Sequence, residues 1–185
     1  SSLQTAGPPA ITHSERLGNR FFVFHHHARR LADRAVSAEQ QISALPGNCK
    51  LLHLGSLALE PADAPRIRAV LQAAAAEQIL ISVDINVRLN AVSDVSTYRS
   101  FLTEVTTLSQ FIKASDEDLQ LLYPQLSTSD ALAALRATAP TALVALTEGD
   151  KGATLYWQQH QISLAVIPAA PFVDTVGAGD TFWAN

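Results

Sequence analysis

The residues most able to do chemistry in this 185-residue chain stand together at 174–182, in the run Asp-Thr-Val-Gly-Ala-Gly-Asp-Thr-Phe. Gly177 and Gly179 let the backbone approach another group closely, and if a helix begins here its free N–H groups attract an anion. Asp180 would stand beside that anion. Because two negative groups repel, a carboxylate at this point makes sense if it takes a proton from a hydroxyl that attacks phosphorus. The alternative is a glycine-rich turn in which Asp180 is only a helix-start charge.

Such a segment needs a scaffold, and the rest of the chain predicts one in which strands and helices alternate. Short apolar runs predict buried strands at 50–54, 79–83, 111–112 and 142–146. Helical spacing and cap residues predict helices at 63–78, 95–108, 116–122 and 129–137, the last capped by Ser129.

Shorter elements complete this scheme. Aromatic and β-branched residues predict a hairpin from 9–13 and 20–24, and a second hairpin from 153–157 and 161–166. Ser37 and Gln40 have the spacing of a capping box, which predicts a short helix ending before Pro46. From residue 175 a turn would lead into a further helix.

Alternating strands and helices predict an α/β fold with a parallel sheet covered on both faces. Ligands of such sheets lie beyond the carboxyl ends of the strands, so polar residues there are candidates for a site. They are Ser56, Asp84, Asn86, Arg88, Lys113, Ser115, Thr147 and Asp180.

Six segments, in order along the chain, resemble motifs of the ribokinase-like (PfkB) carbohydrate kinases. The run at 174–182 is similar to the family signature Asp-Thr-x-Gly-Ala-Gly-Asp-x-Phe. The others are the lid strand Gly-x-Arg-x-Phe-x-Phe at 18–24, a strand ending in Gly-Ser at 52–59, Asp-x-Asn-x-Arg at 84–88, Lys-x-Ser-x-Glu-x-Leu at 113–119 and Thr-x-Gly-x-x-Gly at 147–152. In the third of these, Ile85 replaces the usual proline, which predicts a less rigid turn.

The resemblance implies a ribokinase-like three-layer fold with a mostly parallel central sheet and a small β lid, of which residues 9–27 form part. The family's opening Gly-Gly and Asn-x-Ala region has no match here, and the chain contains no Met. We therefore expect residues 1–185 to be the central part of one larger domain, without its N- and C-terminal parts.

The resemblance also implies roles for residues at the reacting end of the nucleotide. Asp180 would be the catalytic base and bind the sugar, while the backbone of Gly177, Ala178 and Gly179 would form an anion hole. On the lid, Phe24 would contact the sugar.

Further residues would bind the nucleotide and the ions. Asn86 and Arg88 would bind phosphates, and Ser115 and Asp118 would belong to a metal–phosphate water network. Thr147, Gly149 and Gly152 would line the nucleotide. Asp174 would help to bind a monovalent cation. Ser115 and Asp118 replace the Asn and Glu of the common family pattern.

Composition narrows the function classes. The formal net charge is −4, which argues against a nucleic-acid partner, whose binding proteins are usually basic. No apolar run approaches the length of a membrane span. The single Cys excludes an internal disulfide and is consistent with a reducing, cytoplasmic compartment.

The resemblance therefore implies a sugar kinase that uses ATP and Mg²⁺, with K⁺ as a further candidate ion, and that is most similar to fructokinase. Alternatives are a 2-keto-3-deoxygluconate kinase or another sugar kinase of the family, and an inactive nucleotide- or sugar-binding fragment. A dinucleotide-binding domain would need Gly-x-Gly-x-x-Gly near its first strand, which is absent. Sugar and ATP are the expected partners, and a homodimer through the β lid is a further alternative.

Overall fold

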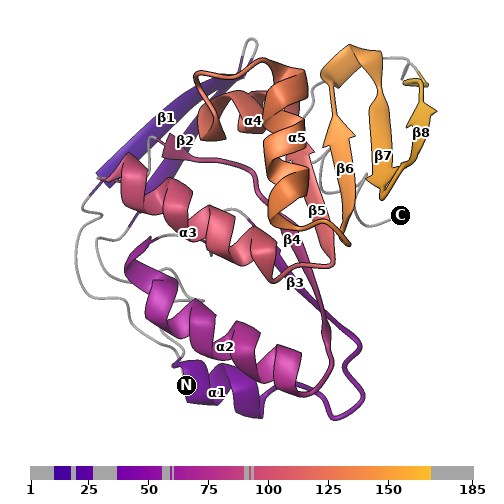
Figure 1. Ribbon diagram of the computed structural model, residues 1–185. Coiled ribbons are helices and arrows are strands. Elements are labelled where there is room, and N and C mark those ends of the chain that lie inside the picture. The colour runs from indigo at the N-terminus through magenta and orange to yellow at the C-terminus, as the bar shows by residue number, and fades with distance from the viewer. Residues whose placement is uncertain are drawn as a thin grey trace.

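The computed structural model describes residues 11–17, 20–26, 37–55, 59, 61–89, 92 and 94–167, the first two segments by their backbone alone. Its centre is a six-stranded sheet in the order β3-β4-β5-β6-β7-β8 (Figure 1). The strands are β3 (Leu51–Gly55), β4 (Leu80–Asp84), β5 (Phe111–Ser115), β6 (Leu143–Thr147), β7 (Ala153–Trp157) and β8 (His160–Leu164). Strands β3 to β6 are parallel, and β7 and β8 follow antiparallel, which confirms the mostly parallel sheet and the second hairpin.

Helix α1 (Ala38–Ser43) precedes β3, and four helices lie in the connections between the parallel strands. They are α2 (Ala64–Ala76), α3 (Val95–Thr107), α4 (Asp116–Leu122) and α5 (Thr128–Thr138). The predicted capping box is present, because the Ser37 and Gln40 side chains each accept the other residue's backbone N–H. The prediction that Ser129 caps α5 was wrong: Ser127 has the extended cap conformation, and its hydroxyl accepts the Asp130 N–H at 3.2 Å.

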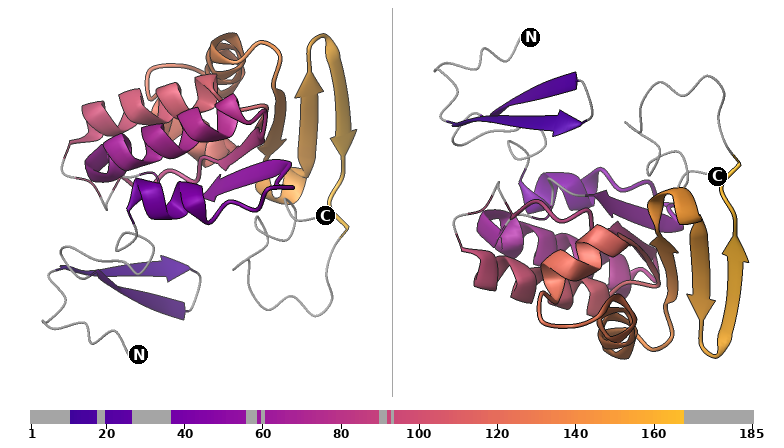
Figure 2. Two further views of the ribbon diagram at one scale, coloured as in Figure 1. Left: turned by 90° about the horizontal axis from the view of Figure 1, so that it is seen from below. Right: turned by 90° about the horizontal axis from the view of Figure 1, so that it is seen from above.

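The helices α2, α3 and α5 lie on one face of the sheet (Figure 2). Strand order follows chain order from β3 to β6, so right-handed crossovers place each connecting helix on the same side. We expected helices on both faces of the sheet. Among the described residues, these three helices cover one of the two faces.

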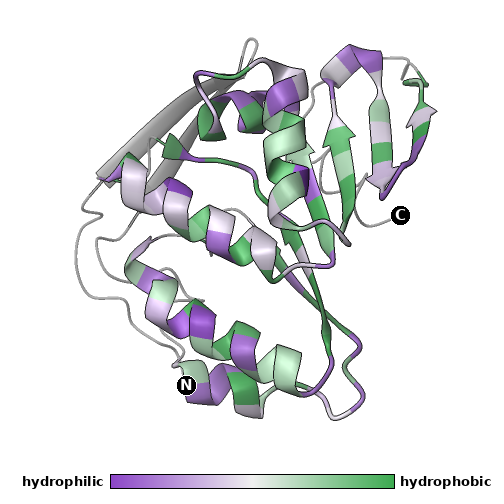
Figure 3. Ribbon diagram, viewed as in Figure 1, coloured by the Kyte–Doolittle hydropathy of each residue, from purple (hydrophilic) through white to green (hydrophobic). Residues whose placement is uncertain are grey.

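The core lies between this helix layer and the sheet. Hydrophobic residues are concentrated on the central strands (Figure 3). The buried cluster joins strand residues such as Val83 and Ile112 to helix residues such as Leu71, Phe101 and Leu135. Because side chains alternate along a strand, Ser82, Asp84 and Lys113 belong to the opposite face from Val83 and Ile112.

The first hairpin is a separate two-stranded antiparallel sheet, made of β1 (Ile11–Leu17) and β2 (Arg20–His26). This confirms the predicted hairpin, with longer strands than expected. In the part of the chain that the structure describes, no helix combines the length and the apolar character needed to cross a membrane.

Candidate functional site

The parallel register brings the predicted strand-end residues to one edge of the sheet. Asp84 pairs with Lys113 across β4 and β5, and Ser115 pairs with Thr147 across β5 and β6. Three connections therefore begin side by side at this edge. The predicted site residues that they carry are Asn86, Arg88, Ser115, Asp118, Thr147, Gly149 and Gly152.

The turn at 85–88 follows β4 and is held by backbone hydrogen bonds. The Ile85 N–H donates to the Lys113 carbonyl at 3.0 Å, and the Arg88 N–H donates to the Tyr98 hydroxyl at 3.3 Å. A proline at position 85 could not make the first bond, so Ile85 ties this turn to β5 where we had expected it to loosen the turn. Asn86 between them has a φ of 36°, in the left-handed region that asparagine tolerates better than most residues.

Arg88 presents its side chain to solvent. Among the described residues, its guanidinium makes one hydrogen bond, a long one of 3.5 Å to the Val87 carbonyl. Most donors of this planar guanidinium are therefore available for the oxygens of an anion such as a phosphate.

Ser115 and Asp118 form a second capping box at the start of α4. The Asp118 N–H donates to the Ser115 hydroxyl at 3.0 Å, and the Ser115 N–H donates to Asp118 Oδ2 at 2.8 Å. The other oxygen, Oδ1, accepts the Val87 N–H at 2.7 Å. The Asp118 carboxylate is buried and joins the 85–88 turn to α4. The Ser-x-x-Asp spacing is the sequence signal that could have predicted this capping box. No local sequence pattern predicts the hydrogen bond between Asp118 and Val87.

Thr147 ends β6, half-buried, and leads into a 3₁₀ turn at Gly149–Lys151. Gly149 has a φ of 57° with open space around its missing Cβ. Gly152 has a φ of 104°, and a Cβ there would lie 2.1 Å from the Leu164 carbonyl oxygen. The packing of β8 thus requires glycine at 152, whereas at 149 only the backbone conformation favours it.

Two further strand-end candidates pair with each other. Lys113 Nζ lies 2.8 Å from Asp84 Oδ2, and both side chains are more than 90% buried. The sequence analysis placed each at a strand end, but their ion pair depends on the β4–β5 register.

Several predicted site residues lie outside the described residues. They are Ser56, Asp174, Gly177, Ala178, Gly179 and Asp180. Phe24 lies in β2, of which the structure describes the backbone alone. Their roles stay predictions.

These features define an α/β protein whose polar groups gather at the carboxyl edge of its parallel strands. The model of the pfkB family carbohydrate kinases matches residues 7–184, and the chain belongs to this family.

Relatives and solved structures agree with this membership. A fructokinase of Rhizobium leguminosarum bv. trifolii is 33% identical over 143 residues, which are 76% of this chain and 43% of the relative. A fructokinase of Vibrio alginolyticus is 29% identical over 165 residues, 89% of this chain and 52% of the relative. The chain therefore spans about half the length of these relatives.

Among solved structures, a fructokinase from Vibrio cholerae O395, in fructose, ADP and calcium ion bound form, is 26% identical with a TM-score of 0.65. The match covers 89% of this chain and 51% of that one. A putative ribokinase II from E. coli, in complex with ATP and Mg²⁺, has a TM-score of 0.72 at 23% identity over 88% of this chain and 51% of that one. These likenesses place the chain in the ribokinase-like fold.

Proposed function

We propose that the full-length protein is an ATP-dependent sugar kinase, with fructose as its substrate. One observation carries the proposal: the register gathers seven predicted nucleotide- and metal-site residues at one sheet edge in a member of this family. Fructose is favoured because the curated relatives described above bear the name fructokinase.

In this proposal the nucleotide lies along the carboxyl edge of the sheet. The exposed guanidinium of Arg88 and the amide of Asn86 bind phosphate oxygens, and the chain from Thr147 to Gly152 lines the nucleotide. Asp180 takes the proton of a sugar hydroxyl while that oxygen attacks the γ-phosphorus, and ADP leaves. Backbone N–H groups of Gly177, Ala178 and Gly179 bind the charge on the moving phosphoryl group.

The ions fit this arrangement in different ways. Both oxygens of Asp118 already accept backbone N–H groups, so Asp118 suits a water-mediated contact with Mg²⁺ better than direct chelation. Within the described ranges, no three His, Cys, Asp or Glu side chains group as a metal site. Mg²⁺, when bound with ATP, would supply neutralisation of phosphate charge. Asp174 is proposed for K⁺.

The test is a sugar-panel assay of the full-length protein with ATP and Mg²⁺. Phosphorylated fructose, detected by mass spectrometry, is the expected product, and preference for 2-keto-3-deoxygluconate or another sugar would replace fructose in the proposal. If no sugar is phosphorylated, the kinase proposal fails. Fructose phosphorylation by the 185-residue chain alone would exclude the inactive-fragment alternative.

A variant tests the proposed base. Asp180→Asn should lower kcat by about 10²- to 10⁴-fold, while Asp130→Asn, the same change at an exposed residue of α5, should leave kcat unchanged. Wild-type turnover in Asp180→Asn would remove Asp180 from the mechanism.

A further inference from the structure

Asp84 and Lys113 form an ion pair inside the sheet. Asp84 Oδ2 and Lys113 Nζ lie 2.8 Å apart, and the two side chains are 6% and 8% exposed. They face each other across neighbouring parallel strands, on the face opposite Val83 and Ile112.

The residues beside the pair are the smallest available. Gly55 of β3 pairs with Asp84, and Ala145 of β6 pairs with Lys113. Gly55, Asp84, Lys113 and Ala145 thus form one row across four strands. The two small residues at its ends leave space for the long lysine side chain to reach Asp84 on the neighbouring strand. Asp84 and Lys113 each precede a candidate site residue by two positions, namely Asn86 in the turn after β4 and Ser115 at the end of β5.

Burying two charges is a poor way to stabilise a sheet. The desolvation cost of a buried ion pair offsets much of its attraction, and a well-packed apolar pair often stabilises as well or better. Loss of one partner alone is costly, because it leaves a buried charge without compensation. The pair therefore needs a role other than net stability.

The geometry supplies such a role. Asp84 directly precedes the 85–88 turn, and the Lys113 carbonyl accepts the Ile85 N–H at 3.0 Å, so Lys113 holds the start of the turn through its side chain and its backbone. We propose that Asp84 and Lys113 are a positioning pair that fixes the 85–88 turn against β5 and thereby sets Asn86 and Arg88 for phosphate. The phosphate part of this statement rests on the proposed function.

The test replaces both charges in the full-length protein. Asp84→Leu combined with Lys113→Met should keep the Tm near that of the wild type. Amide hydrogen exchange at Ile85, Val87 and Arg88 should quicken about tenfold, and KM for ATP should rise about tenfold with a smaller change in kcat. If the apolar pair does not fold, Asp84→Asn with Lys113→Gln makes the same comparison with hydrogen bonding retained.

The matched control is the exposed ion pair between Arg68 of α2 and Glu104 of α3, replaced by Met and Leu. That variant should change neither the exchange of the turn nor KM. Wild-type exchange at 85, 87 and 88 in a folded Asp84/Lys113 double variant would overturn the positioning role, whether or not the protein is a kinase. Faster exchange with unchanged KM would overturn the link to phosphate, and absence of any sugar kinase activity would count against the proposed function alone.

Discussion

The carboxylate of Asp118 accepts the backbone N–H of Val87 at 2.7 Å, across 31 residues of sequence. The same carboxylate accepts the Ser115 N–H at the start of α4. One buried side chain therefore fixes the position of two connections that leave neighbouring strands. This arrangement gives the acid a structural part that is separate from any contact with a metal ion.

Removal of this carboxylate should destabilise the protein. Asp118→Ala leaves the N–H groups of Val87 and Ser115 without their acceptor, and each such loss costs about 1–3 kcal/mol. We expect the free energy of unfolding, measured by urea titration, to fall by about 2–6 kcal/mol. Glu117→Ala, at an exposed position in the same helical turn, should change it by less than about 0.5 kcal/mol. Equal losses in the two variants would contradict the role of Asp118.

Arg88 should affect nucleotide binding without affecting the fold. Its side chain is exposed, so Arg88→Ala should leave the Tm unchanged, while loss of a two-pronged phosphate contact should raise KM for ATP about tenfold or more. Arg88→Lys should recover only part of the affinity, because lysine keeps the charge but not the planar fork. Steady-state kinetics over ATP concentration measures both, and unchanged KM in Arg88→Ala would exclude the contact.

The two glycines of the β6–β7 turn should differ in their tolerance of alanine. In Gly152→Ala the new Cβ meets the backbone oxygen of Leu164, which cannot move without shifting β8, so we expect a loss of about 3 kcal/mol or more. Gly149→Ala meets no atom and should cost about 1 kcal/mol, from its left-handed backbone alone. Thermal unfolding of both variants tests this order of stability. A larger loss of stability in Gly149→Ala than in Gly152→Ala would contradict it.

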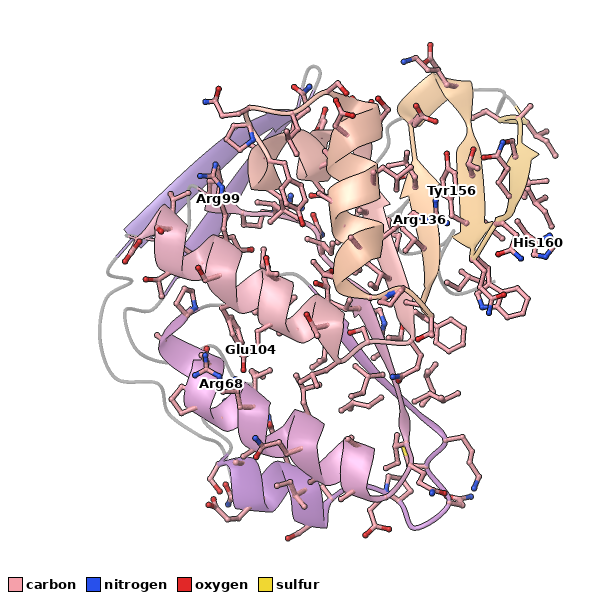
Figure 4. The ribbon with its side chains drawn as sticks, viewed as in Figure 1. Arg68, Arg99, Glu104, Arg136, Tyr156 and His160 are labelled. Carbon is pink, nitrogen blue, oxygen red and sulfur yellow. The ribbon has the colours of Figure 1, made fainter. Side chains whose placement is uncertain are left out.

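The surface pair of Arg68 and Glu104 should give a pH-dependent contribution to stability. Arg68 Nε and Nη2 lie 2.6 and 2.7 Å from the two Glu104 oxygens, and the side chains point toward one another from α2 and α3 (Figure 4). The hydrogen bond from Arg68 holds the pKa of Glu104 below its ordinary value. The folded state therefore favours the charged carboxylate, so this stabilisation is complete above the unfolded pKa of about 4.3 and is lost as the pH falls through the lower folded pKa.

A double-mutant cycle with Arg68→Met and Glu104→Gln, read by urea unfolding, measures this coupling. The coupling should be favourable at about pH 7 and decrease as the pH falls below about 4.3 through the lowered pKa of Glu104, and about 1 M salt should weaken it because both side chains are well exposed. A coupling that stays constant over this range would show that packing, not charge, joins the two helices.

Local patterns predicted most of the elements. Apolar runs placed β3, β4 and β6 within a residue or two, and helical spacing placed α2 and α3. The predicted cap of α5, Ser129, was wrong. Ser127 is a serine as well, and backbone conformation, not residue type, selects it as the cap. β5 continues to Ser115 because it pairs along its whole length with β6, which no local signal showed.

By itself the sequence determined the alternation of strands and helices and the polar residues that follow the strands, because both depend on spacing along the chain. The tertiary structure decided which of those residues meet. Asp84 met Lys113, and Asp118 met Val87, through a register between strands about 30 residues apart, and a register is set by packing across the whole sheet. The requirement for glycine at 152 likewise depends on Leu164 of a strand that arrives later in the chain.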